Sequence, residues 1–301
     1  MVVEHLVPKT LSEATALGRE PETVFMAGGT DVMAAISDGR RAVKRVVSLR
    51  SLAELRERHW EDAGADGAHP EGTGVLYLGA GITHEEVSTD AELRRVFPAL
   101  AQACRTVGAW STRVAGTLGG NVCTAAPSAD SAGPLLAYET QVVLTDGRSV
   151  RRLPLADFYV GAGRTVLQPG EILLAFRIPH PGAHGAAFVK LSRRQAMEIA
   201  LVSATAVLRL DEAGRCRDLR VALGTAAPVP LLLDGAAETA RGRTLDDGLL
   251  ADLALAAAGQ CRPRSGSFRC EPDYRRRMLG VAVKRAVAEA WRQATAEGGA
   301  A

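Results

Sequence analysis

The chain is poor in the residue types that mark several common functional classes. Aromatic side chains make up 4% of its 301 residues, and 36 basic residues are nearly balanced by 34 acidic ones. A nucleic-acid-binding protein would be expected to combine a basic face with stacking rings, so the composition argues against that class. No apolar run approaches the roughly 18–20 residues of a membrane span, and the N-terminus lacks the pattern of a secretory signal. We therefore expect a soluble, cytoplasmic protein.

Closely spaced metal ligands are also missing from the sequence. The five cysteines include no Cys-x-x-Cys pair, whereas iron–sulfur clusters and structural zinc sites need grouped ligands. His180 and His184 stand four residues apart, but Pro181 and Gly182 interrupt the helix that would align their rings. We expect no metal bound by the chain's own side chains.

The length predicts about two domains, because single hydrophobic cores rarely exceed roughly 250 residues. The first fifty residues predict helix 11–17, strand 24–27, helix 31–36 and strand 46–49, and later strands are expected at 142–144 and 172–174. The Pro- and Gly-containing segment 179–182 predicts a domain boundary. Near the C-terminus, Leu279, Val283, Ala286 and Ala290 share one face of a helix predicted over 274–294, which indicates packing.

Three further patterns make local predictions. Ser51 with Glu54, and Thr83 with Glu86, have the spacing of a capping box and predict helix starts. Residues 91–107 carry apolar side chains at three- and four-residue steps and predict one helix. The glycine- and acid-rich stretch 64–74 predicts a loop.

Two glycine-rich turns carry most of the functional information. The first, residues 27–31 (AGGTD), stands between an apolar strand and a helix start, where glycines let backbone N–H groups approach a phosphate. The second, residues 116–121 (GTLGGN), has a similar composition and contains the only asparagine of the chain. Neither matches a Walker A loop or GxGxxG, and each alone is typical of an ordinary tight turn. Together they indicate two walls of a cleft for a dinucleotide pyrophosphate.

The sequence around these turns resembles the FAD-binding medium subunits of molybdenum hydroxylases, a group that includes xanthine, aldehyde, nicotinate and carbon monoxide dehydrogenases. The resemblance is carried by residues 25–32 (FMAGGTDV), 108–130 (GAWSTRVAGTLGGNVCTAAPSAD), 157–179 (DFYVGAGRTVLQPGEILLAFRIP), 188–200 (FVKLSRRQAMEIA) and 271–285 (EPDYRRRMLGVAVKR). It implies an α+β fold with a vanillyl-alcohol-oxidase or PCMH-type FAD-binding domain over residues 1–180. That domain would comprise two α/β subdomains, about 1–55 and 56–180. A smaller C-terminal α+β domain of the CO dehydrogenase flavoprotein type would cover 181–301.

The resemblance also implies which residues contact FAD. Those that would wrap the diphosphate are Met26, Ala27, Gly28, Gly29, Thr30, Asp31 and Val32, with Thr117, Gly119, Gly120 and Asn121 as the second wall. Asp130 would accept hydrogen bonds from hydroxyl groups of FAD, and its alternative role is to cap the helix before Leu135. Leu173 would make an apolar contact, and Lys190 would stand near the flavin unless it is a strand-edge charge.

The same resemblance implies an electron-transfer role in which no side chain of this chain acts as an acid or base. Electrons would come from a two-cluster iron–sulfur small subunit, after hydroxylation at a molybdopterin-binding large subunit, and would pass to NAD⁺ or another acceptor. Residues 126–131 (APSADS) and 193–199 (RRQAMEI) favour a xanthine or hypoxanthine hydroxylase. The alternatives are the flavin subunit of an aldehyde, nicotinate or carbon monoxide dehydrogenase, a stand-alone flavin oxidoreductase, and a non-enzymatic nucleotide-binding protein.

Overall fold

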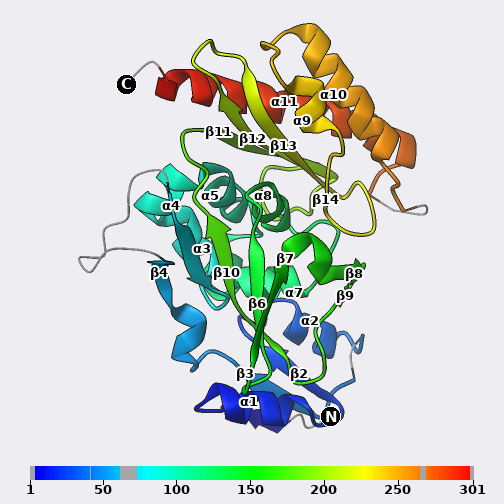
Figure 1. Ribbon diagram of the computed structural model, residues 1–301. Coiled ribbons are helices and arrows are strands. Elements are labelled where there is room, and N and C mark those ends of the chain that lie inside the picture. The colour runs from blue at the N-terminus through cyan, green and yellow to red at the C-terminus, as the bar shows by residue number, and fades with distance from the viewer. Residues whose placement is uncertain (1–3, 41, 62–72, 265–268, 299–301) are drawn as a thin grey trace.

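The fold of the described residues is built on three larger β-sheets that follow one another along the chain, with one additional two-stranded sheet (Figure 1). The computed structural model describes residues 4–40, 42–61, 73–264 and 269–298. The predicted loop 64–74 lies almost wholly outside these residues. In Figure 1 the first sheet lies at the bottom, the second in the middle and the third at the top.

The first sheet is parallel, with the strand order β1–β3–β2. Its strands are β1 (Glu4–Leu6), β2 (Thr23–Met26) and β3 (Arg45–Ser48), connected through α1 (Leu11–Gly18) and α2 (Val32–Ser37). Parallel strands deliver their carboxyl ends to one edge of a sheet. The chain therefore leaves β2 and β3 side by side, and Leu49 N donates to Met26 O at 2.8 Å.

The second sheet is antiparallel, with the order β4–β5–β10–β6–β7. Its strands are β4 (Arg58–Glu61), β5 (Val75–Gly79), β6 (Gln141–Thr145), β7 (Val150–Pro154) and β10 (Ile172–Pro179). Between β5 and β6 the chain forms α3 (His84–Thr89), α4 (Ala91–Val96), α5 (Pro98–Arg105), α6 (Trp110–Ala115), α7 (Leu118–Cys123) and α8 (Ala132–Ala137). A short pair, β8 (Tyr159–Gly161) and β9 (Arg164–Thr165), precedes β10. The largest core surrounds Leu78, Phe97 and Phe176, all fully buried.

The third sheet is antiparallel and carries helices on both faces. It comprises β11 (Gly185–Leu191), β12 (Val202–Leu210), β13 (Cys216–Gly224) and β14 (Leu231–Leu232), in that order. The helices that follow are α9 (Ala236–Ala240), α10 (Asp247–Gln260) and α11 (Pro272–Gly298). Helix α11 packs on β11 and β12, while α5 and α8 lie between this sheet and the second one (Figure 1). The four apolar residues predicted to share one face of α11 are all fully buried, which confirms packing.

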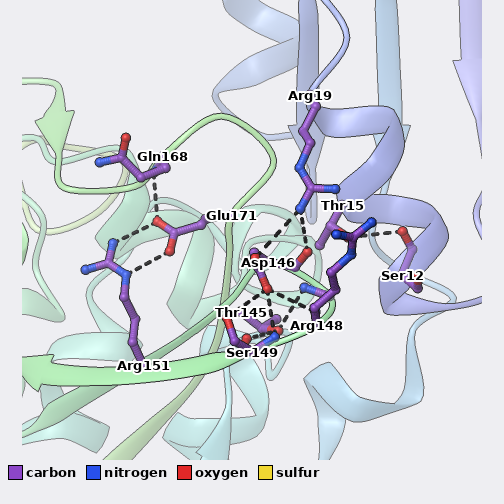
Figure 2. A network of polar contacts seen from close by, with 11 residues as sticks. Ser12, Thr15, Arg19, Thr145, Asp146, Arg148, Ser149, Arg151, Gln168 and Glu171 are labelled. Atoms are coloured by element: carbon purple, nitrogen blue, oxygen red, sulfur yellow. Dashed lines mark hydrogen bonds and ion pairs between the residues drawn. The ribbon is translucent and has the colours of Figure 1, made fainter.

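Helix α1 docks the first sheet onto two tight turns of the second (Figure 2). Arg19 Nη2 donates to Asp146 O at 2.8 Å in the turn between β6 and β7. Gly147 and Gly170 have φ of +85° and +82°, and an added Cβ would collide with Thr15 or Arg19. Only glycine combines this backbone conformation with so close an approach. The contact fixes the edge of the first sheet relative to the second.

Two local predictions were wrong. Ser51 does not form a capping box, because its Oγ donates to Pro8 O at 2.8 Å and only a short 3₁₀ helix follows over Ala53–Arg56. Residues 91–107 form two helices instead of one, since Pro98 lacks an N–H and moves Phe97 to φ −128°, ψ 57°. The capping box of Thr83 and Glu86 is confirmed, with both of its hydrogen bonds present.

Candidate functional site

The structure brings the two glycine-rich turns into direct contact. A Cβ on Gly28 would overlap the carbonyl oxygen of Ala115 and stand 2.8 Å from Gly116 Cα. The loops are also joined by a side-chain hydrogen bond, in which Thr124 Oγ1 donates to Asp31 Oδ2 at 3.2 Å. Glycine at position 28 therefore permits two backbones, far apart in the sequence, to touch at the carboxyl edge of the first sheet.

The second turn is held by the segment that connects β5 to α3. Gly119 N donates to Ala80 O at 2.8 Å, and Leu118 N donates to Ile82 O at 2.9 Å. A Cβ on Gly119 would lie 2.7 Å from Ala80 O, so this position also requires glycine. Thr117 caps α7 by accepting a hydrogen bond from Gly120 N at 3.0 Å.

His84 links the second turn to α5, a role that was not predicted from the sequence. Its backbone N donates to Gly116 O at 3.0 Å, and its ring Nδ1 lies 3.4 Å from Cys104 Sγ on α5. Burial, assisted by the positive charge of Arg113, lowers the pKa of His84 to about 4, so the ring is neutral near pH 7. In the sequence, His84 is the first residue of a helix that the capping box of Thr83 and Glu86 already predicts, and no local pattern indicates a role for its side chain.

The single asparagine links α7 to the segment that leads into α8. Ser131 Oγ donates to Asn121 Oδ1 at 2.6 Å. Within the described residues the Asn121 Nδ2 group makes no hydrogen bond, so its two N–H donors remain available to a ligand. The amide thus holds the loop on one side and offers donors on the other.

Asp130 and Lys190 form a buried ion pair at the base of the third sheet. Lys190 Nζ lies 2.6 Å from Asp130 Oδ2 and also donates to Thr106 O at 3.1 Å. Burial raises the pKa of Asp130 to about 6, although the Lys190 ammonium lowers it. Asp130 Oδ1 is buried without a hydrogen-bond partner among the described residues, so an acceptor is left for a ligand hydroxyl.

The structure answers two questions left open by the sequence, namely whether Asp130 caps a helix and whether Lys190 is a solvent-facing charge on a strand edge. Ser131, not Asp130, is the residue before the first turn of α8, and no side chain there makes a capping bond. Lys190 is on an edge strand, but its side chain is only 8% exposed and points to Asp130 instead of solvent.

The remaining predicted residues have less distinctive surroundings. Met26 ends β2, and Val32 begins α2 and packs on a small core with Val24 and Val46. Leu173 is 4% exposed and belongs to the central core, one residue before Leu174, whose carbonyl accepts from Ala80 N at 2.9 Å. Contact between Leu173 and a cofactor stays a prediction.

A cavity of about 480 Å³ opens between the first and second sheets, beside both turns. Its walls include Ala27 and Arg50 from the first sheet's carboxyl edge, and Arg56, Thr83, Ala115 and Thr117 from the second region. In the described part of the chain, no group of three His, Cys, Asp or Glu side chains is placed to hold a metal ion. Nor is any described helix long and apolar enough to cross a membrane.

These features together define a protein that binds a phosphorylated cofactor with sugar-like hydroxyls. Two touching glycine turns at the carboxyl edge of parallel strands suit a phosphate group. An orphan carboxylate oxygen and a free amide suit hydroxyl and carbonyl groups. The residues present therefore fit a dinucleotide such as FAD.

Comparison with known proteins identifies the family. The family model for the FAD binding domain in molybdopterin dehydrogenase matches residues 2–181, and that for the CO dehydrogenase flavoprotein C-terminal domain matches residues 187–290. The chain belongs to this family of FAD-binding flavoprotein subunits of oxidoreductases. The predictions of fold class and of FAD as cofactor are confirmed.

Individual relatives cover nearly the whole chain. The xanthine dehydrogenase FAD-binding subunit of Escherichia coli O157:H7 is 33% identical over 284 residues, 93% of each chain. The nicotinate dehydrogenase FAD-subunit of Eubacterium barkeri is 30% identical over 249 residues, 80% of each chain. The solved carbon monoxide dehydrogenase from Hydrogenophaga pseudoflava superposes with a TM-score of 0.89 at 25% identity, covering 97% of this chain and 99% of that one.

Proposed function

We propose that the chain holds FAD between its two glycine turns and passes electrons from iron–sulfur clusters of a partner subunit to NAD⁺ or another acceptor. The observation that carries the placement is the contact of Gly28 with residues 115–116, since it puts both turns on one cleft. We divide the chain into an FAD-binding domain over residues 1–180 and a C-terminal domain over 181–301, in keeping with the three sheets.

The proposed roles follow from the atoms that each residue presents. Backbone N–H groups of the first turn, with the Thr30 hydroxyl, donate to the diphosphate. The second turn lines the facing wall, and its Gly119 and Gly120 N–H groups already donate to Ala80 O and Thr117 Oγ1. Asn121 Nδ2 donates to an acceptor of FAD, and Asp130 Oδ1 accepts from a ribityl or ribose hydroxyl. Lys190, neutralised in part by Asp130, places a cation near the flavin.

Bound FAD supplies the redox chemistry of this subunit. The chain's own residues orient the cofactor and exclude water, and none of them is assigned as a proton donor or acceptor in the reaction. The expected partners are a molybdopterin-binding large subunit and a two-cluster iron–sulfur small subunit. Support comes from relatives named as FAD-binding, medium or beta subunits of dehydrogenases.

For the substrate of the whole complex we propose a purine, xanthine or hypoxanthine. The support is the 33% identity to a xanthine dehydrogenase FAD-binding subunit, against 30% for a nicotinate dehydrogenase subunit and 29% for a carbon monoxide dehydrogenase medium chain. The test is turnover by the chain purified with its partners, supplied separately with xanthine, nicotinate and carbon monoxide, with NAD⁺ or an artificial acceptor. Turnover of nicotinate or carbon monoxide but not xanthine would contradict the purine assignment.

The FAD placement is tested on the chain purified alone, by absorption spectroscopy with and without added FAD. We expect about one flavin per chain, and loss of the bound flavin in Gly120→Val, whose Cβ would lie 3.0 Å from Thr117 Oγ1 and would disturb the cap that shapes the second turn. A folded Gly120→Val protein with normal flavin content would remove the second turn from the site.

A further inference from the structure

Arg50 stands beside the first glycine turn although it follows a different strand. It comes two residues after β3 ends, and Leu49 N donates to Met26 O at 2.8 Å at the end of β2. Arg50 and Ala27 line the same cavity of about 480 Å³, which also touches Thr117 of the second turn. The parallel sheet thus puts Arg50 in the wall of a cavity that both turns also line.

The carboxylates around this cavity are already paired with other cations. Glu85 Oε2 lies 2.8 Å from Arg113 Nε, and both side chains are largely buried. Glu86 forms an ion pair with Arg56 and accepts from Thr83 N at 2.8 Å and from Thr83 Oγ1 at 2.7 Å. The acidic side chains that line the cavity therefore have partners other than Arg50.

Arg56 is engaged in the same way. Besides its ion pair with Glu86, its Nη1 donates to Gly81 O at 3.2 Å. Arg50, by contrast, is exposed and has no hydrogen bond or ion pair with any residue in the described ranges. It supplies the uncompensated positive charge of the cavity wall.

A diphosphate linkage carries two negative charges, whereas the backbone N–H groups of the first glycine turn are neutral donors. A guanidinium at the edge of such a site adds charge and a planar pair of donors that match a phosphate. We propose that Arg50 is a cofactor-binding residue whose guanidinium pairs with the diphosphate of FAD. This inference rests on the proposed placement of FAD between the two turns.

The test compares FAD affinity among four single-residue variants of the full-length chain. Arg50→Met removes the charge, Arg50→Lys keeps it, and Arg94→Met removes an exposed charge of α4 outside the cavity as a matched control. Gly120→Val tests the cleft itself. The dissociation constant for added FAD is measured on the apo-protein by flavin fluorescence at low and high NaCl, with circular dichroism to check folding.

We expect Arg50→Met to raise the FAD Kd about tenfold at low salt, the effect of one charge-assisted hydrogen bond of about 1.4 kcal/mol. Arg50→Lys should lie between Arg50→Met and wild type, and Arg94→Met should bind as wild type does. Because salt screens the lost attraction, wild type and Arg50→Met should converge at high NaCl.

Two results would overturn the inference, and they are distinguishable. If Arg50→Met binds FAD like wild type while Gly120→Val does not bind, FAD does bind between the two turns but Arg50 does not contact it. If Gly120→Val also binds normally, the placement of FAD between the turns is wrong, and the role of Arg50 falls with it. Equal weakening in Arg50→Met and Arg94→Met would mean that only net charge matters, which also rejects a specific contact.

Discussion

Asp130 and Lys190, 60 residues apart in the chain, form a salt bridge of 2.6 Å in which each side chain is only 8% exposed. The carboxylate comes from the segment after the second glycine turn, and the ammonium comes from the first strand of the third sheet. One pair therefore ties the loop that completes the site to the C-terminal sheet. Because the pair is buried, removing one partner should cost considerable stability, since the remaining charge would be neither paired nor solvated.

Lys190→Met is expected to destabilise the protein by roughly 3–5 kcal/mol at pH 8, because it leaves a buried carboxylate without a cation. The loss should be smaller at pH 5. Burial raises the pKa of Asp130 from 3.8 to about 6 despite Lys190. The protonated Asp130 carboxyl therefore contributes to the stability of the folded protein below pH 3.8, and this contribution is lost as pH rises through 6. Without Lys190 the pKa rises further, and the penalty extends to higher pH. Urea unfolding at both pH values measures this.

The control for that experiment is the double variant Lys190→Met with Asp130→Asn. Removing both charges should restore most of the free energy of unfolding at pH 8, since an amide is much less costly to bury than an unpaired carboxylate. A double variant as unstable as Lys190→Met would show that packing around the lysine, and not the ion pair, was lost.

Gly28→Ala is expected to separate the two glycine turns. The new methyl group would overlap Ala115 O, so one backbone must move, and FAD affinity should fall at least tenfold with some loss of thermal stability. Gly259→Ala on α10 is the matched control, because nothing lies within 4 Å of its Cβ position. That change should raise stability by about 0.5–1 kcal/mol and leave FAD binding unchanged. Equal FAD affinity in the two variants would argue against the contact as a determinant of the site.

The Asn121–Ser131 hydrogen bond of 2.6 Å is expected to couple the second turn to the Asp130 segment. A double-mutant cycle with Asn121→Ala and Ser131→Ala should give an interaction free energy of about 1 kcal/mol in unfolding experiments. FAD affinity separates their roles, since Asn121→Ala also removes the free Nδ2 donors and should weaken binding more than Ser131→Ala. If Ser131→Ala weakens FAD binding equally, the asparagine acts only by shaping the loop.

His84→Gln is expected to reduce the sensitivity of the protein to acid. Burial lowers the pKa of His84 from 6.5 to about 4, so its neutral ring contributes stability above pH 6.5 that is lost as pH falls through 4. Between pH 7 and pH 4, wild type should lose roughly 3 kcal/mol more than the variant. The measurement is the free energy of unfolding at several pH values. Parallel curves for the two proteins would mean that His84 does not titrate as its burial requires.

Local chemistry made much of the fold predictable from the sequence. The glycines and single asparagine marked the two turns, the capping box at Thr83 and Glu86 marked a helix start, and apolar spacing marked the buried face of α11. Two predictions of local structure failed, one for a local reason and one because of a distant contact. The apolar periodicity continues through Pro98, but the proline separates α4 from α5. The Ser51 hydroxyl donates to Pro8 O, 43 residues away, instead of capping a helix.

The sequence by itself determined which residues can form tight turns and buried faces, because those properties depend on side-chain size, backbone freedom and neighbours within a few positions. Only the tertiary structure decided which turns meet and which charges pair. The contact of Gly28 with Ala115, the pairing of Asp130 with Lys190 and the place of Arg50 beside Ala27 join segments that no local pattern relates. Such contacts arise from the order of strands in a sheet and the packing of sheets on helices, which bring together residues distant in the chain.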